Sequence, residues 1–181
     1  GMTRDDRIKV YDARWQVGEF DDTEVRQLLA ATFVYGHELN VDTVVLSRDA
    51  RQGAPAVLEI AMEEAVRVGL RVYVLAEPVS TPHNYFAVMH LTREHPKTMG
   101  VAITASHNPR EYIGMKMTVP PARAIGLDCG PRGGMTRVRQ LYHEGAKLPH
   151  RGDGTLELID LTDEYIDFCM QLAHVKPGDL K

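Results

Sequence analysis

The fold is decided by one stretch, "GVAITASHNPREYIGMKM" at residues 100–117. Its apolar run, Val101 to Ile103, is typical of a strand that is buried on both faces. After two small residues the chain carries Ser106, His107 and Asn108 ahead of a proline. This pattern fits either an ordinary polar turn or a nucleophile mounted at the end of a rigid strand. The sequence on both sides helps to separate these interpretations.

Strand-like and helix-like segments alternate along the chain, which is typical of an α/β fold. The short connection SHNPREYI cannot hold a crossover helix, so the strand after it should run antiparallel to the strand before it. We therefore predict a mixed, mostly parallel four-stranded sheet covered by helices on both faces. The expected strands cover residues 43–51, 70–76, 98–105 and 114–119, and the expected helices cover 21–39, 54–69, 81–95, 135–145 and 160–175.

Residues with short polar side chains mark the expected helix starts, because their oxygens accept hydrogen bonds from the first backbone N–H groups. Asp21 is expected to cap the first helix. Thr81 is expected to cap the third helix, with Pro82 at its first helical position. Asp160 or Thr162 would cap the last helix.

Size and composition limit the possible functions. With 181 residues, of which 44% are hydrophobic, the chain is expected to form a single α/β domain over residues 1–181. A net charge of −4 argues against a nucleic-acid partner. No apolar run approaches the length of a membrane span, so no membrane partner is expected. Cys129 and Cys169 fit no metal-binding pattern, and we expect two free thiols in a cytoplasmic protein.

Polar loops follow three of the expected strands: SRDAR, AEPVSTPH and SHNP. Ligands of open α/β sheets bind outside the carboxyl ends of the strands, so these loops should share one binding edge. Guanidinium groups match the oxygens of phosphate or carboxylate, and two arginines beside a serine therefore favour phosphate chemistry. The side chains expected at this edge are Arg48, Asp49, Arg51, Thr81, His83, Ser106, His107 and Asn108.

A serine hydrolase is the less favoured alternative. Such an enzyme needs a base within hydrogen-bond reach of the serine hydroxyl. His107 directly follows Ser106, a spacing that tends to point its ring away from the hydroxyl. The Gly-x-Ser-x-Gly motif is also missing from this stretch.

The segment TASHNPREYIGMKM, residues 104–117, resembles the active-site serine loop of the α-D-phosphohexomutases, the phosphoglucomutase/phosphomannomutase family. In that family the pattern runs Thr-Ala-Ser-His-Asn-Pro, then Tyr-Asn-Gly and a lysine. KVYDARW (9–15) resembles the family's Tyr-Asp-Ile-Arg-Gly, SRDAR (47–51) its Gly-Arg-Asp-x-Arg, and VSTPH (79–83) its Thr-Pro segment. The resemblance covers residues 8 to about 172 and only the first of the family's four domains, with the catalytic serine loop at 104–109.

The resemblance implies an enzyme that interconverts hexose 1-phosphate and hexose 6-phosphate through a phosphoserine and a hexose 1,6-bisphosphate. Ser106 would carry the phosphoryl group and, through its phosphate, would bind Mg²⁺. His107 and Asn108 would orient the phosphate and the substrate. Lys116 would neutralise charge and assist proton transfer, with Arg14 as a helper. The other substrate-binding residues that the resemblance implies are Tyr11, Asn108, Arg48 and Arg51.

Three residues beside the site depart from the family pattern. Trp15 and Ser47 stand where the family has glycine, and Ile113 replaces the asparagine of Tyr-Asn-Gly. The serine, histidine, asparagine and lysine are all kept. Two hypotheses stay open on this basis: a divergent mutase, or a non-catalytic domain that binds sugar phosphates or a protein partner.

The family's magnesium loop, Asp-Gly-Asp-Gly-Asp-Arg, does not occur in this sequence. The nearest string, RGDGT at 151–155, has one aspartate and reads as a turn before a strand. We therefore expect the remaining Mg²⁺ ligands and the sugar-recognition loops in later domains of a longer chain. By itself, this chain is expected to have little or no mutase activity.

Overall fold

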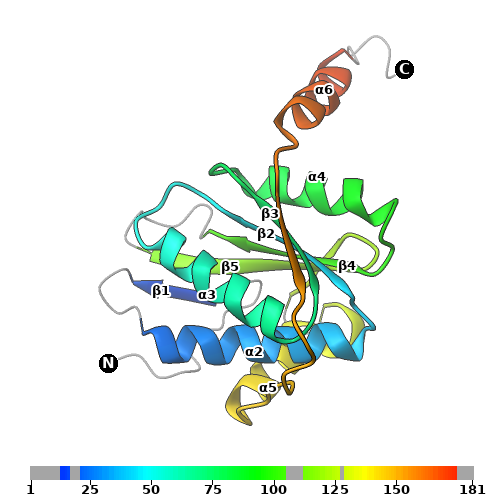
Figure 1. Ribbon diagram of the computed structural model, residues 1–181. Helices are drawn as coiled ribbons and strands as arrows, with labels where there is room; N and C mark the ends of the chain where they lie inside the picture. The colour runs from blue at the N-terminus through cyan, green and yellow to red at the C-terminus, as the bar shows by residue number, and fades with distance from the viewer. Residues whose placement is uncertain (1–12, 17–20, 105–111, 127–128, 175–181) are drawn as a thin grey trace.

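The computed structural model describes residues 13–16, 21–104, 112–126 and 129–174. Strands and helices alternate through most of this part (Figure 1). The strands are β1 (Ala13–Gln16), β2 (Thr43–Arg48), β3 (Arg71–Leu75), β4 (Thr98–Ile103), β5 (Tyr112–Val119), β6 (Arg123–Ala124) and β7 (Thr155–Ile159). The helices are α2 (Asp22–Glu38), α3 (Ala54–Arg67), α4 (Thr81–Thr92), the 3₁₀ turn η2 (Pro131–Gly133), α5 (Met135–His143) and α6 (Thr162–Ala173).

All the described strands belong to one mixed sheet with the order β1-β5-β4-β2-β3-β7, and β6 pairs with β5. Strands β4, β2, β3 and β7 are parallel to one another. Strand β5 runs antiparallel to β4, with Gly100 opposite Thr118 and Ile103 opposite Met115. The predicted α/β class and the antiparallel fourth strand are confirmed.

The predicted number of four strands is wrong, because β1, β6 and β7 extend the sheet. All three lie at the margins of the sheet, where a strand needs little apolar burial. Strand β6 has two residues, both exposed. In β7, Leu158 is 62% exposed, so its residues do not show the periodic burial that identifies a strand in a sequence.

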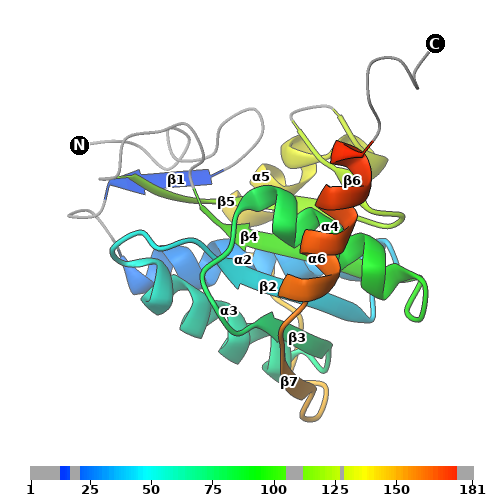
Figure 2. The same cartoon turned by 90° about the horizontal axis from the view of Figure 1, so that it is seen from above.

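Helices cover both faces of the sheet, as predicted (Figures 1 and 2). Helices α2, α3 and α5 bury one face in the larger hydrophobic cluster. Helix α4 covers the other face with a smaller cluster that includes Val45, Leu75 and Val88. Helix α6 packs on α4 through Phe86, whose ring centroid lies 5.1 Å from that of Phe168 and 5.5 Å from that of Tyr165.

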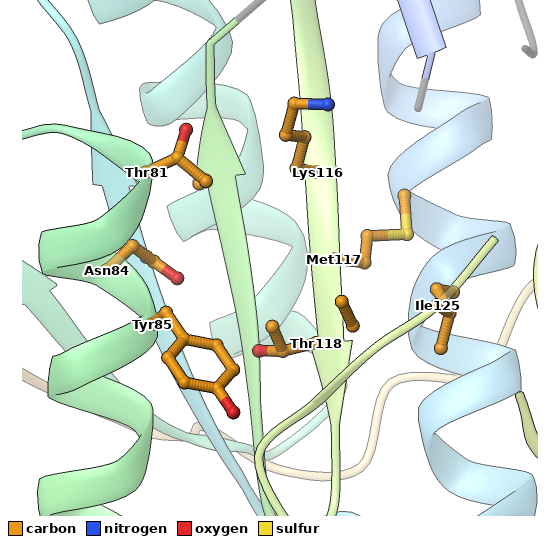
Figure 3. Close-up of a pocket in the computed structure, with 9 residues that line it drawn as sticks. Thr81, Asn84, Tyr85, Lys116, Met117, Thr118 and Ile125 are labelled. Carbon is orange, nitrogen blue, oxygen red and sulfur yellow. The ribbon is translucent and has the colours of Figure 1, made fainter. Parts of the chain in front are cut away.

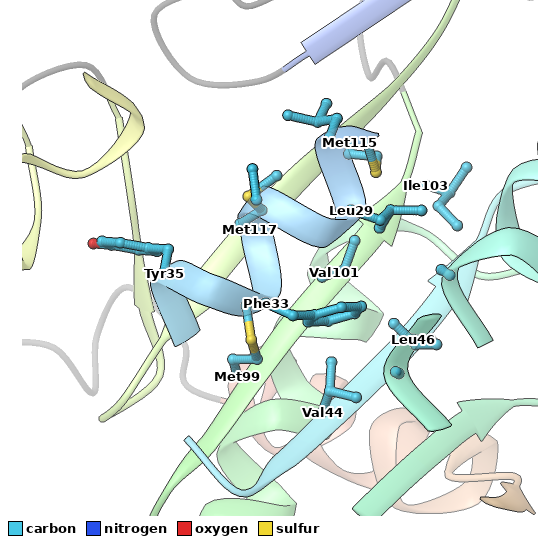
Figure 4. Packing of buried hydrophobic residues seen from close by; sticks show 14 of the residues in the cluster. Leu29, Phe33, Tyr35, Val44, Leu46, Met99, Val101, Ile103, Met115 and Met117 are labelled. Carbon is cyan, nitrogen blue, oxygen red and sulfur yellow. The ribbon is translucent and has the colours of Figure 1, made fainter. Parts of the chain in front are cut away.

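The larger cluster begins with the apolar face of α2, whose residues Val25, Leu28, Leu29 and Phe33 are buried. Phe33 and Leu29 of this helix pack over alternate residues of the central strands (Figure 4). Burying one such side chain contributes about 1.5–3 kcal/mol, so this layer supplies much of the stability. The buried strand residues of this face are Val44, Leu46, Met99, Val101, Ile103, Met115 and Met117.

The opposite face of the same strands carries small and polar side chains. Its members beneath α4 include Ser47, Gly100, Ala102 and Thr118. A Cβ atom added at Gly100 would lie 2.5 Å from Val88 Cγ2 and 2.6 Å from Thr118 Oγ1. The bare backbone of Gly100 therefore sets how closely α4 approaches the sheet.

The helix caps are partly as expected. Asp21 caps α2, and its Oδ1 accepts a hydrogen bond of 2.8 Å from the backbone N–H of Thr23. The cap of α4 is Ser80 and not Thr81, because the Ser80 hydroxyl accepts the N–H of His83. The expected cap of α6 is wrong: its N-cap is Leu161, which has no side-chain cap bond. Asp160 accepts the N–H of Thr162 at 2.9 Å, directly before the helix.

Gly100→Ala is predicted to destabilise the fold by about 1–3 kcal/mol, because the new methyl group forces α4 off the sheet. Denaturant unfolding measures the change. The control is Gly36→Ala, whose Cβ would meet the flexible end of Met99, with Sδ at 2.9 Å. Alanine favours the interior of α2 by about 1 kcal/mol, so the control should lose no stability. Equal stability of Gly100→Ala and the wild type would contradict this packing.

Candidate functional site

The candidate site lies where the parallel strands β2, β3 and β4 end. Arg48 at the end of β2 stands in register with Ile103 at the end of β4. The described residues that follow these strands lie at one edge of the sheet: Thr104 after β4 contacts Asp49 after β2, and the N–H of Val79 after β3 donates to the Arg48 carbonyl. Thr104 is the last described residue before segment 105–111.

Asp49 joins two of these loops. Its Oδ2 accepts hydrogen bonds from Thr104 Oγ1 at 2.7 Å and from Arg51 Nε at 2.8 Å. Its Oδ1 accepts the backbone N–H of Arg51 at 3.0 Å, and its own N–H donates to the Ile103 carbonyl at 3.1 Å. The loop after β2 is thereby fixed to the chain that leads into residues 105–111.

The sequence placed Asp49 at the binding edge without a partner and gave Thr104 no role. An aspartate that bonds the N–H two residues later is a recognisable turn pattern, which could have indicated how Asp49 holds its loop. The Thr104 contact depends on a residue distant in sequence, and a single sequence gives no sign of it. The contact between Asp49 and Thr104 lies directly before segment 105–111, which is outside the described residues.

The two arginines after β2 have different partners. Arg51 forms a partly buried ion pair with Asp49, with 15% of its side chain exposed. Arg48 donates from Nη1 to the Asp49 carbonyl at 3.2 Å. The Arg48 carbonyl accepts the N–H of Val79 at 2.8 Å, which ties the segment before α4 to the end of β2. Arg51 therefore stabilises the loop after β2, and Arg48 lies where that loop begins.

Lys116 lies on β5 opposite Ala102, on the face of the sheet that α4 covers. It lines a cavity of about 250 Å³ together with Thr81 and Asn84 of α4 (Figure 3). The structure therefore brings Lys116 and Thr81 to one cavity. Its lining is completed by Tyr85, Ala102, Met117, Thr118, Ala124 and Ile125.

Several predicted site residues cannot be placed. Ser106, His107, Asn108 and Tyr11 lie outside the described residues. Arg14 belongs to β1, where its backbone pairs with Gly114 of β5, two positions from Lys116. The roles of these residues stay predictions.

One departure from the family pattern has a clear structural role. Ser47 is buried in β2, and its Oγ accepts a hydrogen bond of 2.6 Å from Asn84 Nδ2 of α4. A glycine at position 47 could not make this contact. The hydroxyl therefore fixes the first turns of α4 beside the end of β2. A serine at the end of an apolar strand signal indicates that its hydroxyl needs a hydrogen-bond partner, because buried polar groups are nearly always hydrogen-bonded.

The prediction that His83 faces the binding edge is wrong. His83 is 6% exposed and stacks on Tyr165 of α6, with ring centroids 4.4 Å apart. The ring of His83 thus lies against α6 and not at the ends of the strands. Burial lowers the pKa of His83 from its usual 6.5, against the opposing effect of Asp160.

Within the described ranges, no three histidine, cysteine, aspartate or glutamate side chains lie close enough together to hold a metal ion. The string at 151–155 leads into β7, as predicted. In the same part of the chain, no helix has the length and apolar character needed to cross a membrane.

The family model for phosphoglucomutase/phosphomannomutase, alpha/beta/alpha domain I, matches residues 6–128. The chain belongs to this family. The resemblance found in the serine segment is therefore confirmed, and it concerns the family's first domain.

Curated relatives agree with this assignment. The chain is 33% identical over 172 residues to a phosphomannomutase of Salmonella typhimurium, an alignment covering 93% of this chain and 35% of the relative. It is 34% identical over 124 residues to phosphohexose mutases of Xanthomonas campestris pv. campestris, covering 68% of this chain and 26% of the relative. The chain thus spans roughly a third of the length of such family members.

Solved structures share the fold. A phosphoglucomutase/phosphomannomutase family protein from Burkholderia thailandensis superposes with a TM-score of 0.73 at 23% identity, covering 92% of this chain and 35% of that one. A structure from Thermus thermophilus gives a TM-score of 0.74 at 27% identity, covering 94% of this chain and 36% of that one. The predicted fold class is confirmed by these superpositions.

Thr104→Val is predicted to loosen the loop after β2, since it removes the hydrogen bond to Asp49. Losing one such bond costs about 1 kcal/mol, which corresponds to an increase of about fivefold in local opening. Hydrogen exchange at the Asp49 and Arg51 amides measures it. Thr92→Val is the control, because the Thr92 hydroxyl bonds within α4 itself, at the Val88 carbonyl. Unchanged exchange in Thr104→Val would show that Asp49 does not join the loops.

The buried His83 predicts a pH dependence of stability. Its lowered pKa means that the unfolded chain binds a proton more readily than the folded chain. The free energy of unfolding should therefore fall as the pH drops below about 6.5. His83→Phe keeps a ring against Tyr165 and removes the titration, so its decline should be shallower. Urea unfolding at about pH 7.5 and about pH 5.5 measures both slopes. Identical slopes would contradict a neutral, buried His83.

Proposed function

We propose that this chain is the first domain of a phosphohexomutase, in which Ser106 carries a phosphoryl group between the 1- and 6-positions of a hexose. The observation that supports this most directly is the Asp49–Thr104 hydrogen bond at the end of β4. It gives the segment containing Ser106 a fixed starting point, with Lys116 on the neighbouring strand. Phosphoryl transfer depends mainly on such positioning and on charge neutralisation.

The proposed reaction has two transfers. In the first, a hydroxyl of the hexose phosphate attacks the phosphorus of phosphoserine 106. The bond from phosphorus to the serine oxygen breaks, the bond to the sugar oxygen forms, and Lys116 takes the hydroxyl proton and passes it to the departing serine oxygen. This gives hexose 1,6-bisphosphate. In the second, the Ser106 hydroxyl attacks the phosphorus of the other phosphate of the turned intermediate, the bond from that phosphorus to the sugar oxygen breaks, and Lys116 takes the serine proton and gives it to the departing sugar oxygen.

The remaining roles belong to the same proposal. Arg48 and Arg14 would neutralise phosphate charge, and Tyr11 would line the pocket. His107 and Asn108 would orient the phosphate and the sugar. Arg51 acts through Asp49, because the two form an ion pair.

Magnesium is part of the proposal through the phosphoserine oxygens, which are hard ligands that suit this ion. The described residues offer no cluster that could hold it by themselves. The further ligands and the sugar-recognition loops would come from later domains, since relatives are about three times as long as this chain. This chain by itself would then be a poor catalyst. Cys129 and Cys169 are free, which fits a cytoplasmic location.

A second candidate is a non-catalytic domain that binds sugar phosphates. Trp15 and Ile113 favour it, because both depart from the family pattern beside the site. The two candidates differ in one observable property, the presence of phosphate on Ser106 in protein purified from cells.

Ser106→Ala tests the phosphoserine. The wild-type chain, purified from cells or incubated with glucose 1,6-bisphosphate, is expected to gain the mass of one phosphoryl group on Ser106. The variant should stay unmodified with an unchanged melting temperature. Mass spectrometry of the intact chain and its peptides measures both. A wild-type chain without phosphate under both conditions would favour the non-catalytic domain.

Lys116→Met tests proton transfer in the longer protein. Removing an acid–base group costs about 10²-fold or more in turnover. The Michaelis constant for the hexose phosphate should change much less, because the methionine keeps the bulk of the side chain. Steady-state kinetics measures both values. Equal turnover in wild type and variant would reject the acid–base role.

A further inference from the structure

Strand β7 and helix α6 carry most of the apolar surface that the described part of the molecule leaves exposed. Among the described residues, seven large hydrophobic side chains are exposed, and five of them belong to these two elements: Leu156, Leu158, Ile166, Met170 and Leu172. Apolar side chains that gather on one region of a surface mark interaction sites more often than single ones do. The contacts of α6 separate the side that is already packed from the side that is not.

One side of α6 packs on α4. The rings of Tyr165 and Phe168 lie on this side, with centroids 5.5 Å and 5.1 Å from that of Phe86. Tyr165 also stacks on His83. Figures 1 and 2 show α6 as a layer outside α4, on the side of α4 away from the sheet. No residue of α6 is buried, so α4 covers only part of the helix surface.

A second side of α6 is apolar and exposed. Ile166 is followed three and four residues later by Cys169 and Met170, and seven residues later by Ala173, a spacing that places all four on one side of the helix. Ile166 is 47% exposed and Met170 is 53% exposed. We call these four residues the outer stripe. The apolar stripe of a surface helix ordinarily faces a packed partner, so the outer stripe suits a partner beyond the described residues.

Acidic side chains border the outer stripe. Asp163 precedes Ile166 by three residues and Asp167 precedes Met170 by three, so each carboxylate lies beside an apolar member of the stripe. Residues 160–174 contain four carboxylates and no lysine or arginine. A second copy of α6 would therefore bring like charges together, which is unfavourable. A partner that complements this surface has apolar side chains with lysine or arginine around them.

We propose that the outer stripe docks a later domain of the longer protein, which meets it with an apolar patch surrounded by basic side chains. The chain spans 35% of the length of a related phosphomannomutase, so most of such a protein lies outside this chain and can supply that patch. The inference rests on the part of the proposed function that places further domains in a longer protein. It does not depend on the phosphoryl transfer.

The thiol of Cys169 reports on this docking, because it lies within the outer stripe and is exposed in this chain. Iodoacetamide should alkylate it readily in this chain. In the longer protein the reaction should be at least about tenfold slower, since it must wait for the covering surface to open. Peptide mapping by mass spectrometry measures the rate at each cysteine.

Ile166→Lys in the longer protein tests the stripe itself. It places a cation against the basic side chains of the partner and removes an apolar contact, so Cys169 should become about as reactive as in this chain. Gln171→Lys is the matched control, because it adds the same charge beside Asp167 on the polar side of the helix and should leave Cys169 protected. Both positions are exposed and lysine favours helices, so α6 should stay folded. Cys129, which lies outside α6, should react alike in both variants and the wild type.

Three results would overturn the proposal. The first is equally fast alkylation of Cys169 in this chain and in the longer protein. The second is unchanged protection of Cys169 in Ile166→Lys. The third is a dimer of this chain in sedimentation equilibrium that protects Cys169 and is lost in Ile166→Lys, which would make a second copy the partner.

Phosphate on Ser106 is measured on the same peptide digests, which separates this proposal from the mutase proposal. A reactive Cys169 together with a phosphorylated Ser106 in the longer protein would reject the docking alone. A protected Cys169 together with an unmodified Ser106 would support the docking and reject the phosphoserine alone.

Discussion

The close approach of α4 to β4 at Gly100 is the constraint on which the rest of the site depends. A Cβ at this position would lie 2.5 Å from Val88 Cγ2, so no other residue allows the helix to lie so near the sheet. The same approach lets Asn84 reach Ser47 in β2. The two contacts fix α4 over the central strands. Thr81 and Lys116 can line one cavity because this helix position is fixed.

The two faces of the central strands differ in the side chains that they carry and in what those side chains contribute. One face packs Phe33 and Leu29 of α2 against apolar strand residues and provides stability (Figure 4). The other face carries the small and polar side chains beneath α4 and provides room and hydrogen-bonding groups. At the end of the strands, Asp49 links the loop after β2 to Thr104. The segment with Ser106 therefore begins from a rigid support, which suits a reaction governed by positioning.

The central fold could be predicted because its signals are local. Apolar runs marked β2, β3 and β4, and the short connection after β4 required an antiparallel β5. Strands β1, β6 and β7 were left out of the predicted sheet, although a strand after residues 151–155 was expected, because exposed marginal strands show no burial pattern. Of the candidate site, Arg48 and Arg51 were expected from the polar loop after the first strand, and Lys116 from the resemblance to the family. The contacts of Thr104, Asn84 and Ser47 join residues far apart in sequence. His83 was misplaced for the same reason, because it stacks on the distant Tyr165 of α6.

The central claim is that a phosphate on Ser106 lies among the cations of the sheet edge. The most direct measurement is the second pKa of that phosphate, followed by ³¹P NMR of the phosphorylated chain against pH. In an unfolded chain, phosphoserine has a second pKa of about 6. Nearby cations such as Arg48 and Lys116 would favour the dianion, so the folded chain should titrate at a clearly lower pH than the same chain in urea. Identical titration in the folded and unfolded chain would contradict the account.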